Sequence, residues 1–181
     1  MVPYRCIFSA LLLVGALHLH STAEISTGNG SCFYQGCKQV SGAVSFSKLG
    51  LFSAVDIGIL DLVSIGGVTG YNRYDELTGW QYRRFPVLGR VALHPLNFSF
   101  LADLLLIRDR IDLYGGIAAG FIYIHSSWNG IRDQQIGTPD ESGVSIGPYL
   151  GLRLSLTDRW QVFVENCGDA SAFALGVGMR F

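Results

Sequence analysis

Charged side chains are scarce in this chain. Asp, Glu, Lys and Arg make up 15% of its 181 residues, whereas soluble domains usually contain about 25%. Lysine occurs only at Lys38 and Lys48, and the formal net charge is −1. The chain therefore lacks the clustered basic surface with which proteins bind nucleic acid, and we expect no nucleic-acid partner.

Long apolar runs are also missing. Beyond the amino terminus, no uninterrupted apolar stretch reaches the length of about 18 residues that predicts a transmembrane helix. Yet hydrophobic residues make up 49% of the chain, and its mean hydropathy is +0.34. A closed β-barrel is the other structure that satisfies its backbone hydrogen bonds inside lipid. Apolar composition without a helical span therefore favours a membrane barrel.

The amino terminus has the pattern of a secretory signal peptide. Arg5 precedes an apolar core over residues 7–19, and Ser21, Thr22 and Ala23 place small residues before a cleavage site. We predict that residues 1–23 are removed and that the exported protein begins at Glu24. A membrane anchor or a buried helix is the alternative interpretation.

Cysteine is sparse as well, and three cysteines remain after this cleavage. Cys32 and Cys37 close a short loop in a Gly-rich segment of an exported chain, so we predict a disulfide between them. Their spacing differs from the Cys-x-x-Cys of redox and zinc sites and no His lies nearby, so this pair does not indicate such a site. Nothing else in the sequence implies a bound metal or organic cofactor, and we expect none. Cys167 is interpreted as a small residue packed at a strand end.

The last residues of the chain, 169–181, alternate with a period of two. Phe173, Leu175, Val177, Met179 and Phe181 are large and apolar, and the residues between them are small apart from one arginine. This pattern predicts a strand with one apolar face, and it is long enough to cross a membrane, which takes about 9–11 residues. Such an apolar edge would promote aggregation of a soluble protein, so we expect it to face lipid.

The ending from Gly176 to Phe181 resembles the terminal strand of bacterial outer-membrane β-barrels, especially the small eight-stranded barrels of the OmpA, OmpX and OmpW type. The resemblance implies an all-β fold, namely an antiparallel up-and-down transmembrane β-barrel of eight strands in the outer membrane. It also implies that Val177, Met179 and Phe181 form a carboxyl-terminal assembly signal. The expected partners are then the barrel-assembly machinery and outer-membrane lipid, and we expect a monomer.

Alternation along residues 41–181 predicts the strands of this barrel, after a polar periplasmic segment over residues 24–40. The predicted strands cover residues 41–50, 52–60, 62–74, 80–94, 109–125, 143–157, 159–168 and 169–181. The first two are either separated by a tight turn at Gly50-Leu51 or form one long strand, and an even strand count favours two. Residues 97–108 are too long and too apolar for a turn, and a short interfacial helix is one interpretation.

The polarity of the two faces indicates which one points inward. A soluble, lipocalin-like barrel would carry many charges outside, but here the second face is rich in Gly, Ala and Ser. A membrane barrel is therefore preferred, and a secreted lipocalin-like binder is an alternative. Aromatic residues near strand ends are interpreted as girdles at the membrane interfaces; they are Tyr71, Tyr74, Trp80, Phe121, Tyr123 and Trp160.

Charged residues on the inward face are predicted to form a network in the lumen. An unpaired buried charge is costly, so these groups must pair. We expect Arg153 to pair with Glu165 and Arg90 with Asp112, which would plug a narrow barrel; a proton or ion path is the functional alternative. The predicted network comprises Asp56, Arg84, Arg90, His94, Asp112, Arg153, Glu165 and Arg180.

The expected function is that of an integral outer-membrane protein without enzymatic activity. Such a protein is either structural and surface-exposed or a narrow channel for small molecules, hydrophobic ones included. The stretch His125-Ser126-Ser127-Trp128-Asn129 supplies an enzymatic alternative, because His and Ser are the components of an activated nucleophile. It resembles the His-x-Ser-Asn motif of outer-membrane lipid A deacylases, with the Asn displaced by one residue. In that case His125 and Ser127 would be catalytic, with Glu141 as the orienting acid.

Overall fold

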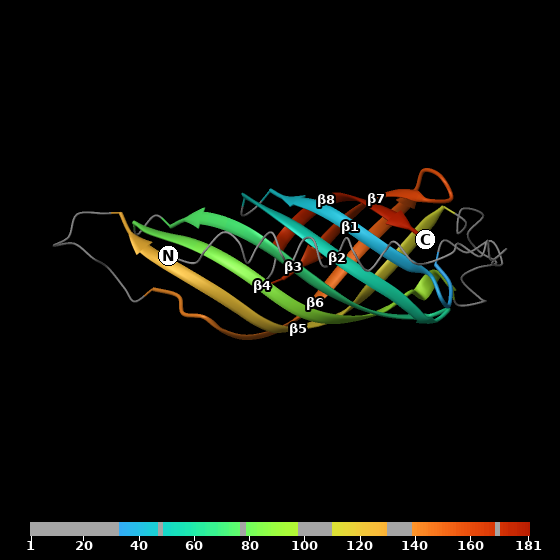
Figure 1. Cartoon of the computed structure of the whole chain (residues 1–181), viewed down its shortest axis with the longest axis horizontal. Helices are drawn as coiled ribbons and strands as arrows, with labels where there is room; N and C mark the ends of the chain where they lie inside the picture. The colour runs from blue at the N-terminus through green and yellow to red at the C-terminus, as the bar shows by residue number, and fades with distance from the viewer. Residues whose placement is uncertain (1–32, 47–48, 77–78, 98–109, 130–138, 169–170) are drawn as a thin grey trace.

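The computed structural model describes residues 33–46, 49–76, 79–97, 110–129, 139–168 and 171–181. Within these ranges, eight strands form a closed barrel in which each strand is antiparallel to the next and β8 pairs with β1 (Figure 1). The predicted all-β, eight-stranded antiparallel barrel is confirmed. The elements are β1 (Lys38–Ser45), β2 (Leu49–Leu60), β3 (Val63–Asp75), β4 (Trp80–Leu93), the 3-10 helix η1 (Pro95–Asn97), β5 (Ile111–Trp128), β6 (Gly143–Ser155), β7 (Trp160–Cys167) and β8 (Ser171–Arg180).

The two ends of the barrel differ. At the terminal end, where β1 begins and β8 stops, short connections join β2 to β3 and β6 to β7. At the opposite end, called the loop end, β5 reaches far beyond the shorter strands because it has 18 residues (left in Figure 1). In the described part of the chain, no helix is long and apolar enough to cross a membrane.

Side chains alternate between the outer wall and the lumen, as the period of two requires. Large apolar residues cover the wall; Val144 and Ile146, for example, are 85% and 71% exposed. The inward positions of the strands carry small residues, the buried charged residues, and a hydrophobic core cluster that includes Phe52, Leu88 and Ile122. The predicted orientation is therefore confirmed, with Ile57 and Ile59 facing out and Asp56 facing in.

Residues 38–60 form two strands, but the turn between them lies earlier than predicted. Gly50 and Leu51 are within β2, where they pair with Asn72 and Tyr71, so the predicted turn at Gly50-Leu51 is wrong. Gly50 serves close packing instead of a turn. A Cβ atom at this position would lie 2.5 Å from the Tyr71 carbonyl oxygen and 2.6 Å from the Asn72 Cβ.

The barrel also begins earlier than the boundary predicted at residue 41. Lys38 and Gln39 already pair with Ile57 and Asp56 across to β2. The residues before them pack against the terminal end, since Phe33 and Cys37 are buried. The last part of the predicted periplasmic segment 24–40 therefore belongs to the barrel.

Several sequence predictions fall outside the described residues. They are the signal peptide over residues 1–23, the Cys32–Cys37 disulfide, because of Cys32, and the interfacial helix beyond Asn97. These stay predictions. Cys167 is buried as the last residue of β7, as the sequence suggested.

Candidate functional site

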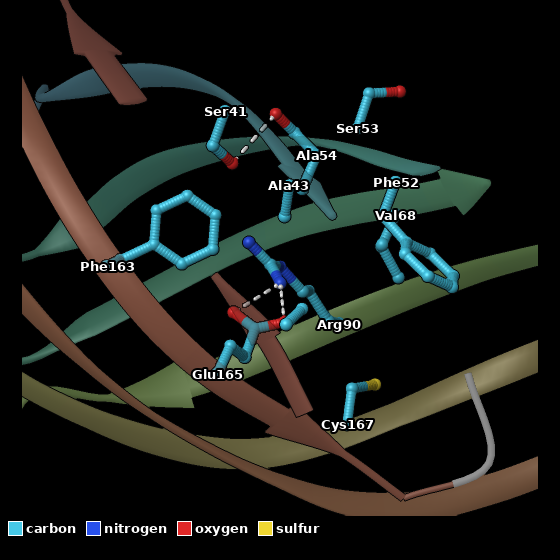
Figure 2. Close-up of a pocket in the computed structure, with 11 residues that line it drawn as sticks. Ser41, Ala43, Phe52, Ser53, Ala54, Val68, Arg90, Phe163, Glu165 and Cys167 are labelled. Carbon is cyan, nitrogen blue, oxygen red and sulfur yellow. Dashed lines mark hydrogen bonds and ion pairs between the residues drawn. The ribbon is translucent and has the colours of Figure 1, made fainter. Parts of the chain in front are cut away.

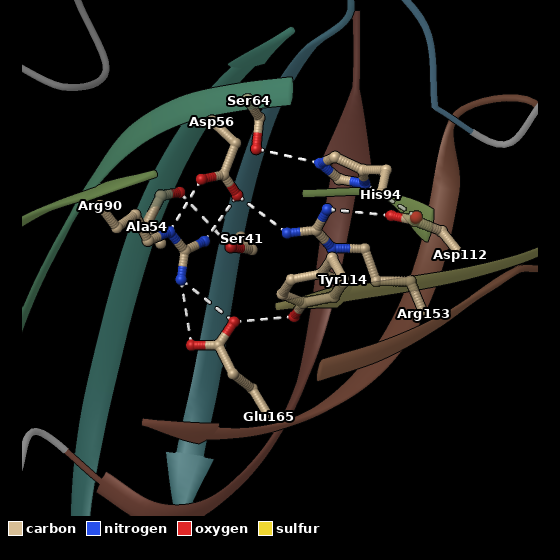
Figure 3. Close-up of polar contacts among 10 residues, drawn as sticks. All are labelled: Ser41, Ala54, Asp56, Ser64, Arg90, His94, Asp112, Tyr114, Arg153 and Glu165. Carbon is tan, nitrogen blue, oxygen red and sulfur yellow. Dashed lines mark hydrogen bonds and ion pairs between the residues drawn. The ribbon is translucent and has the colours of Figure 1, made fainter. Parts of the chain in front are cut away.

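Six of the eight predicted lumen residues meet in one buried cluster near the terminal end of the barrel (Figure 3). Each belongs to a different strand or strand end, and each takes the inward position of the alternation. They are Asp56 of β2, Arg90 of β4, His94 just after β4, Asp112 of β5, Arg153 of β6 and Glu165 of β7, all buried.

Arg90 connects two carboxylates that come from non-adjacent strands, β2 and β7. Its Nε and Nη2 atoms donate to the two Asp56 carboxylate oxygens at 2.8 and 2.5 Å. Its Nη1 atom donates to Glu165 Oε1 and Oε2 at 3.0 and 3.1 Å. Paired hydrogen bonds of this kind, between charged groups, are the strong ones in proteins.

Arg153 makes the second connection. Its Nη2 donates to Asp56 Oδ2 at 2.9 Å, and its Nη1 donates to Asp112 Oδ2 at 3.3 Å. The guanidinium also lies 3.7 Å from the centroid of the Tyr114 ring, a favourable cation–π arrangement. The Tyr114 hydroxyl donates to Glu165 Oε2 at 2.7 Å, which joins the two halves of the network.

His94 closes the network toward the terminal end. Its Nδ1 lies 2.8 Å from Asp112 Oδ1, and its Nε2 lies 3.0 Å from the Ser64 hydroxyl. The Phe33 ring stacks on the imidazole with centroids 3.6 Å apart. Three carboxylates and two guanidiniums are thus enclosed with one imidazole, behind an aromatic ring that caps the lumen.

The predicted pairs Arg153–Glu165 and Arg90–Asp112 are both wrong. In register, Arg153 is the direct partner of Asp112, while Arg90 stands opposite Ala118, further along β5. The Tyr114 ring occupies the space beside Gly151, and so it lies between Arg153 and Glu165. The stagger of the strands brings Glu165 to Arg90 instead.

Arg84 and Arg180 share the inward alternation but lie outside this cluster. Arg84 is half-buried nearer the loop end and forms no ion pair within the described residues. Arg180 lies at the terminal rim, where its Nε and Nη2 donate to the Asp158 carbonyl oxygen at 3.0 and 2.9 Å.

Tyr114, Ser64 and Phe33 were not among the predicted site residues. The alternation of the sequence places Tyr114 and Ser64 on the inward face, but it does not show which other side chains they contact. Phe33 is a bulky aromatic residue in an otherwise polar, Gly-rich segment, and this was the available signal.

The lumen beside Arg90 and Glu165 contains a small cavity (Figure 2). This cavity has a volume of about 20 Å³ for the centres of water molecules, which is room for one or two waters. Ser41, Phe52 and Phe163 are among its lining residues. In the described part of the chain, no group of three or more His, Cys, Asp or Glu side chains is arranged to hold a metal ion.

Aromatic side chains close the loop end of the lumen. Trp80 and Tyr82 are buried, and Tyr74 stacks on Tyr82 with centroids 5.0 Å apart. The prediction that Trp80 and Tyr74 belong to a lipid-facing girdle is wrong, because their parity points them inward. The other predicted girdle residues are exposed on the wall: Tyr71, Phe121, Tyr123 and Trp160.

The predicted assembly signal lies on the outer wall. Val177 and Phe181 are 54% and 40% exposed, and Met179 pairs with Val40 of β1 and with Trp160 of β7. The Phe181 N–H donates to the Lys38 carbonyl oxygen at 2.8 Å. β8 therefore closes the barrel while presenting its apolar side outward.

His125 and Ser127 lie on the outer wall of β5, both exposed. They pair in register with Arg83 and Gln81 of β4. Among the described residues, no hydrogen bond joins His125 to Ser127 or to the exposed Glu141.

No protein-family model matches the sequence, and no curated protein matches it significantly. Solved structures do match. The chain is similar to the outer membrane protein OprG from Pseudomonas aeruginosa, with a TM-score of 0.56 and 9% identity over 84% of this chain and 98% of OprG. It is also similar to Ail, the attachment invasion locus protein of Yersinia pestis (TM-score 0.44, 15% identity, 81% of this chain and 99% of Ail). A third match is Neisserial surface protein A (TM-score 0.44, 10% identity, 80% of this chain and 92% of that one). The fold is that of the small eight-stranded outer-membrane barrels, as the resemblance implied.

Proposed function

We propose that this chain is an integral outer-membrane protein whose strands span the bilayer as a monomeric barrel. The observation that carries the proposal is the wall of exposed large apolar side chains, which surrounds a lumen that contains the buried charged residues. An apolar outer wall of this kind is unfavourable in water, whereas a transmembrane barrel must present such a wall to lipid. The terminal end then lies in the periplasm and the loop end at the cell surface.

Within that location, we propose a structural or surface role without an open pore. The ion network fills the lumen near the terminal end, Phe33 caps it, and aromatic rings fill the loop end. An eight-stranded barrel has a bore just wide enough for side chains. We therefore infer that these groups leave no continuous water column.

Gel migration and planar-bilayer recording test the two parts of this proposal. The unheated protein should migrate differently from the heated one, since a closed barrel resists unfolding by detergent, and it should fractionate with outer membrane. The refolded barrel should show no nanosiemens-scale conductance. Release as a soluble periplasmic protein would instead support the lipocalin-like alternative, and a large ohmic conductance would contradict a sealed lumen.

A narrow route for small hydrophobic molecules is a second candidate, and one observation favours it. The cavity beside Arg90 is also lined by Ser53, which stands opposite Gly42 in the wall between β1 and β2. At this register position β1 and β2 carry only small residues, Gly42 and Ser53, so cargo could leave sideways into lipid between these two strands. Gly42→Leu should then slow uptake of a small apolar dye into vesicles, while Gly67→Leu, an outward glycine on β3, should not.

The assembly machinery remains a proposed partner. Phe181→Ala should slow insertion of the barrel in a reconstituted assembly reaction, because the terminal aromatic residue is the part of the signal that the resemblance identifies.

The lipid A deacylase alternative is tested by fatty-acid release from lipid A. If the unmodified protein releases none, a catalytic role for His125 and Ser127 is refuted.

A further inference from the structure

Three basic side chains form a row on the outer wall at the loop end. Arg73 of β3 pairs in register with Arg83 of β4, and Arg83 pairs with His125 of β5. All three are exposed. Directly opposite residues on neighbouring strands have Cβ atoms about 4.5–5.5 Å apart. The two guanidinium groups and the imidazole can therefore contact a single ligand.

This row is unfavourable for the barrel by itself. Like charges directly opposite each other destabilise a sheet. Asp75 offsets little of the repulsion, because its carboxylate lies 3.9 Å from Arg73 Nε and both side chains are about half exposed, at 59% and 48%. Neither Arg83 nor His125 takes part in any ion pair of the described residues. Within the described residues, Arg83 therefore has no counter-ion and Arg73 has only the exposed Asp75, and this favours an anion from outside.

Tyr71, Phe85 and Tyr123 form an aromatic row beside the basic row, displaced from it toward the middle of the barrel. The Tyr71 and Phe85 rings have centroids 5.0 Å apart, and those of Phe85 and Tyr123 are 6.2 Å apart. Aromatic belts of this kind mark the edge of the hydrocarbon layer. The basic row is two residues further along the strands, about 6–7 Å. This offset matches the headgroup layer, which adds roughly 5–7 Å on each side of the hydrocarbon.

The basic row is also local. Within the strands as described, the outward-facing ionised side chains are Lys38 at the terminal end and Arg73, Asp75 and Arg83 at the loop end. Elsewhere near the loop end the wall presents exposed Leu49 and Val144. A general attraction to a charged membrane surface would spread cations around the rim, whereas here they occupy three adjacent strands.

We propose that Arg73, Arg83 and His125 bind the phosphate group of an anionic lipid in the outer leaflet. Arginine matches phosphate oxygens with paired hydrogen bonds, and the imidazole adds a third donor. The acyl chains then lie along the exposed Val87 and Phe121 next to the aromatic row. The site rests on the proposed membrane location and specifies which lipid chemistry the wall recognises.

Lipid binding to the refolded barrel in detergent micelles tests the site. The probe is purified lipid A, a phosphorylated glycolipid, titrated by native mass spectrometry. The R73Q/R83Q variant should bind it about thirtyfold more weakly than the unmodified protein, a loss of about 2 kcal/mol at about 1.4 kcal/mol per factor of ten. K38Q/R159Q is the matched control, since it removes two exposed cations at the terminal end, and it should bind like the unmodified barrel.

A second arm needs no variant. Lipid A from which the phosphates have been removed should bind the unmodified barrel as weakly as lipid A binds R73Q/R83Q. The proposal would be overturned if R73Q/R83Q bound lipid A as tightly as the unmodified barrel does, or if the unmodified barrel bound dephosphorylated lipid A as tightly as lipid A. Displacement of lipid A by equimolar inorganic phosphate would also overturn it, because it would indicate a site for the free ion. Failure of the unmodified protein to insert into lipid vesicles would instead refute the membrane location itself.

Discussion

Arg90 is the residue on which the packing of the lumen depends most. It is almost completely buried, and it contacts Asp56 and Glu165, which come from strands on different sides of the barrel. A buried ion pair contributes little net stability over an apolar pair, but the loss of one partner leaves a charge without compensation. Single substitutions in the network should therefore be severe.

Replacing Arg90 with Met is expected to lower the free energy of unfolding by about 3–5 kcal/mol, because Asp56 and Glu165 would lose a buried cation. Urea titration of the refolded barrel measures this loss. Ion conductance in planar bilayers should rise at the same time, since the lumen would admit water. Arg84→Met is the control, because Arg84 faces the same lumen without an ion pair among the described residues. Equal losses in both variants would refute the importance of pairing.

The outer wall has a matching test at Leu152. This residue is exposed at 43% and stands between Leu113 and Val164 on the neighbouring strands. Leu152→Arg should cost about 2–4 kcal/mol in lipid, because a cation would face the hydrocarbon, whereas Leu156→Arg at the rim should cost about 0–1 kcal/mol. Reversible unfolding in lipid vesicles measures both variants. If Leu152→Arg leaves the stability unchanged, this wall does not face lipid.

At the scale of elements, β4 and β5 form the longest pairing in the barrel as described, from Trp80 with Trp128 to Leu93 with Gly115. Small residues on the inward side of β5 allow its backbone to lie close to that of β4. A Cβ atom at Gly116 would overlap the Val91 carbonyl oxygen and lie 2.8 Å from the Ala92 Cα. Glycine at this inward position thus permits the close approach of β5 to β4.

Gly116→Ala is therefore expected to destabilise the barrel by about 1–3 kcal/mol, the usual cost of overpacking. The obstructing atoms are backbone, so they cannot rotate away. Gly89→Ala on the same strand pair is the control, because the nearest atom to its Cβ would be 3.8 Å away. Urea midpoints of the two refolded variants provide the measurement, and a midpoint for Gly116→Ala as high as that for Gly89→Ala would contradict the close approach.

At the scale of the whole molecule, closure ties both ends of the described chain together. β1 pairs with β8, and Phe33 and Asn97 join distant segments at the terminal end, since the Asn97 side-chain amide donates to the Phe33 carbonyl oxygen at 2.8 Å. The barrel therefore needs residues from just before β1 to seal its periplasmic side in the proposed orientation. These residues must stay attached when the exported chain is processed.

Processing after Ala23 satisfies this condition, since it leaves Phe33 in the exported protein. The mature protein is expected to begin at Glu24, because small residues precede that bond. Amino-terminal sequencing of the protein recovered from outer membranes measures the start. Recovery with Met1 intact would remove the argument for secretion by a cleaved signal.

Alternation by itself determined the fold class and the two faces of each strand. Leu150, Leu152 and Leu154 could be assigned to the wall from sequence alone, since parity along a strand is a local property with a period of two. Scarce charge and apolar composition then indicated lipid as the surroundings of that wall. The same parity placed Asp56, Arg90 and Glu165 in the lumen.

Only the tertiary structure decided which lumen residues meet. Contacts across a barrel depend on the stagger of the strands, which no local pattern contains. The pairing of Arg153 with Glu165 that the sequence predicts is therefore wrong, and Arg153 contacts Asp112 and Asp56 instead. A glycine in the sequence is equally ambiguous. Gly50 is compatible with a turn or with close packing of two strands, and only the position of β3 shows that it serves close packing. The capping of His94 by Phe33 is also non-local, because four complete strands, β1 to β4, separate these two residues in the sequence.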